Sequence, residues 1–219
     1  MVKNIVILGG LGNGSVIANA IEHANKMGYN EWICKGFLND RVPVGGFIDS
    51  YPVLGNLSDA QKFINDDYYI INTIFRIDGQ EDRLDLFLKL NIPDERLATF
   101  VHPMAYVAPN VQLSPGTVIM PQVTLSSGTK FGKSCLVMVG ATVGHDNLIG
   151  DFCHIAAQAC VGAYIKIGTG VHIGLNSTIR ENLTIGNYAT VGMGAVLTKN
   201  VGDYEIWVGN PAKFLRKAK

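Results

Sequence analysis

The sequence has no excess of charge of either sign, and this absence narrows the range of partners. Eighteen lysines and arginines balance eighteen aspartates and glutamates in 219 residues. Surfaces that bind nucleic acid usually carry a basic patch or stripe, which this composition does not favour. The chain also lacks a signal-peptide pattern and an apolar run of the ~18 residues that a membrane span needs. We therefore expect a cytoplasmic protein that binds neither nucleic acid nor membrane.

Cysteine is scarce, and its spacing excludes the usual metal and redox motifs. The four cysteines (Cys34, Cys135, Cys153 and Cys160) form no CxxC pair. We expect them to be free, buried thiols in a reducing compartment. No linker rich in serine, glycine or proline divides the chain, so we expect its parts to pack rigidly against one another.

A period of six residues organises the second half of the chain. From Val101 to Leu197, every sixth residue is large and apolar, without a slip over seventeen hexads. A helix repeats near 3.6 residues and a strand near 2, so neither explains this period. Six residues fit one short strand and one corner, so three hexads would close a triangular coil of a parallel β-helix. The second residue of a hexad is often glycine, which we expect to serve corners with positive φ.

A different pattern precedes the repeat. An apolar run at residues 3–9 is followed by a glycine-rich loop at 9–15, a helical spacing up to Gly28, and a second strand near 32–38. Such a unit can hold a phosphate at the helix N-terminus. Ile17 stands where the third glycine of a dinucleotide motif would fall, so a mononucleotide diphosphate fits at least as well. A tight turn without any ligand stays open as an alternative.

Further elements complete a small α/β domain before the repeat. We expect helices near residues 59–64 and 79–90, and strands near 68–74 and 97–100. The sequence thus predicts an α/β domain over residues 1–100 and a β-helix domain over residues 101–219, which ends in a basic tail.

A β-helix is a scaffold, so catalytic groups should be polar residues that face outward from it, and the histidines of the repeat are the candidates. His145 is third in its hexad and is followed by Asp146. A neutral imidazole can take a proton from an attacking amine or hydroxyl, and a carboxylate can fix its tautomer. An exposed turn without a catalytic role is the alternative for this pair. His154 and His172 are both sixth in their hexads, so they should stack on successive coils.

Residues 144–155 (Gly-His-Asp-Asn-Leu-Ile-Gly-Asp-Phe-Cys-His-Ile) resemble the catalytic segment of the PglD/NeuD-type sugar acyltransferases, a hexapeptide-repeat family. The glycine loop, the strand end at 37–40 and residues 208–213 are similar to theirs, so the resemblance covers essentially the whole chain. It implies a Rossmann-like domain for a nucleotide-linked sugar, then a left-handed parallel β-helix for acetyl-CoA. It also implies a homotrimer with active sites between neighbouring copies.

The resemblance also implies roles for single residues. His145 would be the general base and Asp146 its partner, and His154 would contact the thioester carbonyl. The acetyl-CoA site would comprise His154, Ala163, Leu175, Gly192, Met193 and Gly194. From its charge, Lys213 of the basic tail would add a contact to a CoA phosphate, and a solvated C-terminus stays open as the alternative. The nucleotide-sugar site would comprise Gly10, Gly12, Asn13, Gly14, Asn39 and Asp40.

Together these features predict an acetyl-CoA-dependent N-acetyltransferase that acts on the amine of a nucleotide-linked amino sugar. Transfer would be direct, because no cysteine stands beside a base, and no metal would take part. Three alternatives stay open. They are O-acetylation of a sugar hydroxyl as in the sialic-acid branch, a zinc enzyme of the γ-carbonic-anhydrase type built from His145, His154 and His172, and a non-catalytic binding or structural β-helix.

Overall fold

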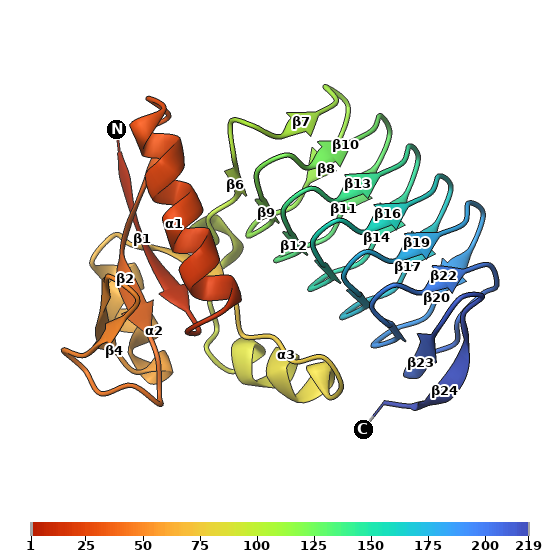
Figure 1. Cartoon of the computed structure of the whole chain (residues 1–219). Helices are drawn as coiled ribbons and strands as arrows, with labels where there is room; N and C mark the ends of the chain where they lie inside the picture. Colours follow the sequence, from red (N-terminus) through yellow and green to blue (C-terminus); the bar gives the residue numbers. More distant parts are fainter. Residues whose placement is uncertain (1, 219) are drawn as a thin grey trace.

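The computed structural model describes residues 2–218, and Figure 1 shows two parts side by side. The first part contains strands β1 (Lys3–Leu8), β2 (Trp32–Leu38), β3 (Phe47–Ile48), β4 (Tyr51–Gly55) and β5 (Tyr69–Asn72), and helix α1 (Asn13–Lys26). The strands form one sheet of order β3-β4-β2-β1-β5, in which only β3 and β4 pair antiparallel. Helix α1 leads from β1 to β2, so the β-α-β order predicted for residues 3–38 is present.

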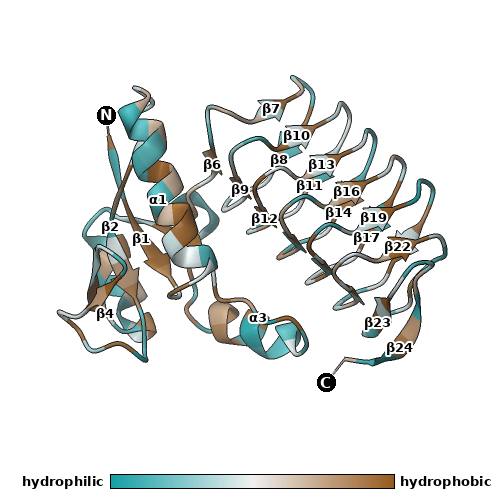
Figure 2. Ribbon diagram, in the orientation of Figure 1, coloured by the Kyte–Doolittle hydropathy of each residue, from teal (hydrophilic) through white to brown (hydrophobic). Residues whose placement is uncertain are grey.

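The central position of β1 explains its composition. Its last four residues, Ile-Val-Ile-Leu, are fully buried, because neighbouring strands and covering layers leave neither face to solvent. Helix α1 buries Ile17, Ile21 and Ala24, which recur at helical spacing and share one core cluster with Phe37 of β2. In Figure 2 the strand is brown beyond its hydrophilic first residues, whereas the helix carries both brown and teal residues along its length.

Three short elements differ in their ends from the sequence-based prediction. Helix α2 spans Ala60–Asn65 after a 3₁₀ turn at Leu57–Asp59, and α3 spans Gln80–Leu88. Of the strand expected at 97–100, Leu97 forms only an isolated bridge with Ile70, directly after a 3₁₀ turn at Asp94–Arg96, and Phe100 belongs to β6 (Phe100–Val101) of the second part.

From Phe100 onward the chain forms two-residue strands that stack in parallel sheets (Figure 1). Each strand joins the sixth residue of one hexad to the first residue of the next. His154, for example, pairs with His172, eighteen residues later, as the repeat predicts. These stacked sheets are consistent with the left-handed β-helix that we expected. The strands are β6 Phe100–Val101, β7 Tyr106–Val107, β8 Gln112–Leu113, β9 Val118–Ile119, β10 Thr124–Leu125, β11 Lys130–Phe131, β12 Leu136–Val137, β13 Thr142–Val143, β14 Leu148–Ile149, β15 His154–Ile155, β16 Cys160–Val161, β17 Lys166–Ile167, β18 His172–Ile173, β19 Thr178–Ile179, β20 Thr184–Ile185, β21 Thr190–Val191 and β22 Val196–Leu197.

The strands fall into three sheets that form the sides of a triangular prism. The first side has the order β22-β19-β16-β13-β10-β7, and the second has the order β20-β17-β14-β11-β8. The third runs from β6 through β9, β12, β15, β18 and β21, and ends in the hairpin of β23 (Glu205–Val208) and β24 (Lys213–Lys217). The first part of the chain covers this third side, where outward residues such as Leu136, His154 and His172 are buried.

The first residues of the hexads form the core of the prism, as predicted, except at its open end. They are buried from Ile119 to Leu197, whereas Val101 is 40% exposed and Val107 and Leu113 are only partly buried. The first coil has no preceding coil to cover it, so its apolar side chains remain accessible. Of the four free cysteines, Cys135 and Cys153 are buried in the core, but Cys34 is only half-buried and Cys160 is exposed, contrary to the expectation for all four.

The expected role of the second-position glycines is wrong, because these residues serve close packing and not positive φ. A Cβ on Gly144 would lie 2.5 Å from the carbonyl oxygen of Gly162, on the next coil. A Cβ on Gly150 would lie 2.7 Å from the carbonyl carbon of Gly168. Left-handed backbone occurs instead at fourth positions of hexads, as at Asp146 (φ 54°). Glycine at the second position therefore lets successive coils approach each other.

No helix within residues 2–218 is long and apolar enough to cross a membrane.

Candidate active site

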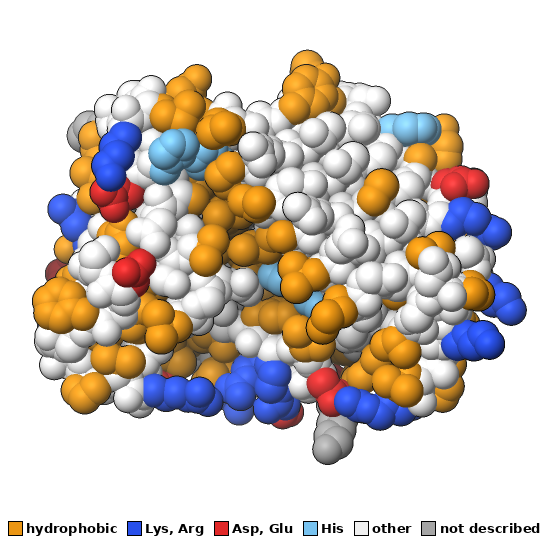
Figure 3. All heavy atoms as spheres, in the orientation of Figure 1, with side chains coloured by type: hydrophobic (Ala, Val, Ile, Leu, Met, Phe, Trp, Pro, Cys, Tyr) orange, Lys and Arg blue, Asp and Glu red, His pale blue; other side chains and the backbone are white. Residues whose placement is uncertain are grey.

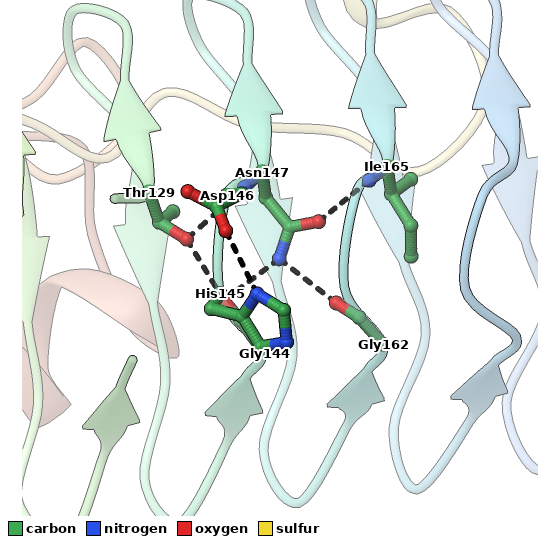
Figure 4. Close-up of polar contacts among 7 residues, drawn as sticks. All are labelled: Thr129, Gly144, His145, Asp146, Asn147, Gly162 and Ile165. Atoms are coloured by element: carbon green, nitrogen blue, oxygen red, sulfur yellow. Dashed lines mark hydrogen bonds and ion pairs between the residues drawn. The ribbon is translucent and has the colours of Figure 1, made fainter. Parts of the chain in front are cut away.

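His145 and Asp146 form a hydrogen-bonded pair at one corner of the prism, between β13 and β14. The Nδ1 of His145 lies 2.8 Å from Oδ2 of Asp146, and both side chains are about half exposed (Figure 4). Asp146 adopts the left-handed conformation that aspartate tolerates better than most residues. The carboxylate accepts a hydrogen bond from Nδ1–H, which is the tautomer of imidazole that has its lone pair on Nε2. Within residues 2–218, Nε2 has no hydrogen-bond partner, so it can accept a proton from a substrate.

Asn147 fixes the backbone that carries this pair. Its side chain is fully buried at an inward hexad position, where the other residues are mostly small or β-branched. The amide nitrogen donates to the carbonyl oxygens of Gly144 and Gly162 at 2.8 Å, and the amide oxygen accepts from the Ile165 backbone at 2.7 Å (Figure 4). The corner of His145 is thereby tied to the next coil. Asn147 was not predicted from the sequence, although a polar residue in an inward column is a signal that it needs buried partners.

His154 and His172 stack on successive coils, as the repeat predicts, and they are buried beneath the first part of the chain. Their Nδ1 atoms lie 3.0 Å apart, and the Nε2 of His154 lies 3.3 Å from Nδ2 of Asn13. The Phe75 ring stacks on His154 at 4.6 Å between centroids. Burial lowers the pKa of His154 to about 3, with a further contribution from His172, and burial lowers the pKa of His172 to about 4. Both rings are neutral at pH 7, and both nitrogens of His154 are already engaged.

A groove of about 410 Å³ lies along the buried side of the prism. It brings together four of the residues that the resemblance gives to acetyl-CoA: His154, Leu175, Gly192 and Met193. The other three, Ala163, Gly194 and Lys213, do not line it, and Lys213 is exposed at the start of β24. One rim is closed by an ion pair of 2.8 Å between Arg216 of β24 and Asp78, which precedes α3.

A second cavity, of about 590 Å³, lies at the carboxyl ends of β1, β2 and β5. Of the six predicted nucleotide-sugar residues, Gly10, Asn39 and Asp40 line this cavity. The side chains of Asn39 and Asp40 also hold neighbouring loops in place. Asn39 donates to Gly9 O of the glycine loop at 2.7 Å, and Asp40 accepts from Leu57 N at 2.8 Å.

The other three predicted nucleotide-sugar residues lie outside this cavity. Gly12 caps α1 with φ 92°, and Asn13 faces the 410 Å³ groove. Gly14 is buried, and a Cβ on it would lie 2.9 Å from the Phe37 ring. This glycine therefore serves the packing of α1 on the sheet.

Comparison with known proteins shows which proteins the whole chain resembles. No protein-family model and no curated protein sequence matches the chain. Among solved structures, the acetyltransferase domain of PglB from Neisseria gonorrhoeae has 27% identity and a TM-score of 0.82, and covers 97% of this chain and 100% of that one. WeeI from Acinetobacter baumannii has 27% identity and a TM-score of 0.74, with the same coverage. The chain is similar throughout to hexapeptide-repeat acetyltransferases. The predicted resemblance is confirmed, and so is the expectation of an acyltransferase.

A third neighbour shares the fold. Perosamine N-acetyltransferase from Caulobacter crescentus, solved as a histidine-to-asparagine variant, is 22% identical, has a TM-score of 0.84, and covers 99% of each chain.

Several residues that line the 590 Å³ cavity were not predicted from the sequence. Arg41, Arg76 and Arg83 line the 590 Å³ cavity and give it positive charge, and Phe75 forms part of its wall. Figure 3 shows lysine and arginine side chains gathered along the lower edge of the first part of the chain, at the lower left of the view. Arg41 lies far from Arg76 and Arg83 in the sequence, so no local motif marks the three together. Within residues 2–218, no group of three or more histidine, cysteine or acidic residues is placed to hold a metal ion.

Proposed function

We propose that the protein transfers the acetyl group of acetyl-CoA to the amine of a nucleotide-linked amino sugar. The observation that carries the proposal is the His145–Asp146 pair with an unpartnered Nε2. Two neighbours support the substrates: the PglB domain was solved with acetyl coenzyme A, and perosamine N-acetyltransferase with CoA and GDP-perosamine. In this proposal residues 1–100 form a Rossmann-like nucleotide-sugar domain, and residues 101–219 form the left-handed β-helix domain that binds acetyl-CoA.

The proposed mechanism is direct transfer with His145 as general base. The amine nitrogen attacks the thioester carbonyl carbon while Nε2 of His145 takes the amine proton. Asp146 stabilises the imidazolium that forms. The tetrahedral oxyanion would be bound by a backbone N–H, for which Ala163, one coil beyond His145, is the candidate. Collapse of this intermediate breaks the C–S bond, and the CoA thiolate takes the proton back from His145.

The positions of His145 and the groove favour a homotrimer. His145 lies at the corner between the first two sides of the prism, and the groove with His154 lies on the third side. In a triangular prism that corner is opposite the third side, so His145 does not line the groove of its own chain. Prisms packed side by side would bring His145 of one copy to the groove of the next.

Gly128→Ala should lower activity by displacing Asp146. A Cβ on Gly128 (φ 75°) would overlap Oδ1 of Asp146, so the carboxylate would turn away from His145. We expect kcat to fall ten- to a hundredfold, since small misplacements of catalytic groups have effects of ~10²-fold. Gly140→Ala is a matched control: it has a similar φ of 69°, but its Cβ would meet only Gln158 Cγ at 3.6 Å. Both variants should lose about 1–2 kcal/mol of stability to backbone strain. Equal kcat values for the two variants would contradict the proposed role of Asp146.

A test of the acceptor separates this proposal from its alternatives. In the presence of a nucleotide-linked amino sugar, we expect the protein to release CoA from acetyl-CoA. Colorimetric detection of the free thiol measures this release. Acetylation of free sialic acid instead would identify the O-acetyltransferase alternative. Failure to release CoA with every UDP-, dTDP- and GDP-linked amino sugar tested would favour a non-catalytic binding protein.

A further inference from the structure

A continuous hydrogen-bonded chain of three side chains crosses the boundary between the two parts of the protein. Asn13, at the start of α1, contacts Nε2 of His154, and Nδ1 of His154 contacts Nδ1 of His172. The two imidazoles are nearly parallel, with 13° between their planes and 5.1 Å between their centroids. In Figure 3, histidine side chains are visible in the seam between the two parts, among apolar side chains.

The donors and acceptors of the three side chains determine the direction of the hydrogen bonds that join them. Each buried histidine is neutral at pH 7, because burial lowers both pKa values, so each ring carries one proton. The Asn13 amide nitrogen can only donate, so Nε2 of His154 accepts and the proton of His154 is on Nδ1. That proton is donated to Nδ1 of His172, so the proton of His172 is on Nε2. Within residues 2–218, this Nε2–H has no hydrogen-bond acceptor.

The location of His172 relates this donor to the acyl substrate. His172 lines the 410 Å³ groove together with Leu175 and Met193, and it retains 6% exposure. The groove is mainly apolar, so a donor without a protein acceptor there is available to a carbonyl oxygen of a ligand. His154 cannot fill this role in the present arrangement, because both of its ring nitrogens are engaged.

We propose that His172 donates a hydrogen bond from Nε2 to a carbonyl oxygen of the acyl donor, and that Asn13 and His154 act as positioning residues that set its tautomer. This inference rests on the proposed acetyl-CoA function. The carbonyl can belong to the thioester or to an amide of the pantetheine arm. Asn13 begins the helix that follows the glycine loop. The proposed nucleotide-sugar domain would therefore determine which atom of His172 donates a hydrogen bond into the 410 Å³ groove. Phe75, whose ring contacts both histidines and lines the 590 Å³ cavity, connects the same two sites.

Tautomers of the full-length protein, read by NMR with labelled histidine, test the direction of the chain. We expect His154 with its proton on Nδ1 and His172 with its proton on Nε2. Asn13→Asp supplies an acceptor in place of a donor, so both tautomers should reverse. Asn19→Asp is the matched control, because Asn19 lies on the same helix but is exposed, and within residues 2–218 the one hydrogen bond of its side chain is to Asp49. A wild-type spectrum with the His154 proton on Nε2 would overturn the inference.

Ligand binding tests the role of the donor. His172→Phe keeps a ring in the stack but removes the donor, and we expect it to raise the KM for acetyl-CoA about tenfold, as loss of one hydrogen bond would. Asn13→Asp should raise the same KM although His172 is still present, an effect that a purely structural role would not produce. A parallel rise in the Kd of CoA, measured by calorimetry, would assign the contact to the pantetheine arm, and an unchanged Kd would assign it to the thioester.

Wild-type binding separates failure of this inference from failure of the proposed function. If the wild-type protein binds CoA and His172→Phe and Asn13→Asp leave both constants unchanged, the inference is wrong and the function stands. If the wild-type protein neither binds CoA nor releases it from acetyl-CoA, the proposed function is wrong as well.

Discussion

His145→Ala should lower kcat by about 10²–10⁴, the usual contribution of a positioned general base. The variant removes the imidazole of His145, whose Nε2 has no hydrogen-bond partner within residues 2–218 and is therefore available as a proton acceptor. The KM for acetyl-CoA should change little, because the proposed role of His145 is to take a proton from the acceptor amine and not to bind acetyl-CoA. Steady-state kinetics with the best nucleotide-linked amino sugar measures both constants.

The stability of this variant provides its control. His145 is about half exposed and makes one ring contact, with Tyr164 at 4.9 Å between centroids. Its removal should therefore change the free energy of unfolding by less than ~1 kcal/mol, as for most surface substitutions. Retention of more than a few per cent of the wild-type kcat would show that His145 is not the base.

Asn147→Ala should be the most destabilising of the substitutions considered, by about 3–5 kcal/mol. It leaves two backbone groups without a partner, the carbonyl of Gly162 and the buried N–H of Ile165, and each such group costs ~1–3 kcal/mol. The carbonyl of Gly144 loses one of its two hydrogen bonds and keeps the one from the Thr129 hydroxyl. Denaturant or thermal unfolding would measure the loss. Because the same bonds hold the corner of His145, kcat should fall in the folded variant too.

Ser177→Ala is a graded control for this substitution. Ser177 occupies the equivalent inward position of a later hexad, is also fully buried, and donates a single hydrogen bond to Gly174 O at 2.8 Å. We expect a loss of about 1 kcal/mol. A similar loss for Asn147→Ala would mean that water or relaxed backbone replaces the amide, and that Asn147 does not fix the corner.

The register of the prism could be predicted from the sequence because each coil contacts mainly the coils before and after it. The stacking of His154 on His172 required only the spacing of eighteen residues. The burial of the same histidines could not be predicted, since it depends on how the first part of the chain packs on one side of the prism. The hydrogen bond from Asn13 to His154 joins residues 141 positions apart, and no local pattern indicates it.

The site residues divide in the same way. His145 and Asp146 are adjacent in sequence, so their hydrogen bond follows from one turn. The cavity of the first part depends on three loops, and only the glycine loop and the end of β2 have a sequence signature. Arg41 and Arg76 meet there because they follow parallel strands that end at the same edge of the sheet, and Arg83 reaches the cavity from α3. The second-position glycines were recognised from the sequence, but their role became clear only from the distance between coils.

The eighteen-residue coil also restricts how the length of this protein can change during evolution. Insertion or deletion of one hexad between β9 and β15 would rotate every later strand by one side of the triangle. His154 and His172 would then leave the side covered by Phe75, and the groove would lose its wall. A whole coil could be gained or lost with all three sides kept in phase, although the height of His154 relative to Asn13 would change. Natural length variation should therefore occur in complete coils beyond His172, or in loops at the corners, where it does not alter the phase.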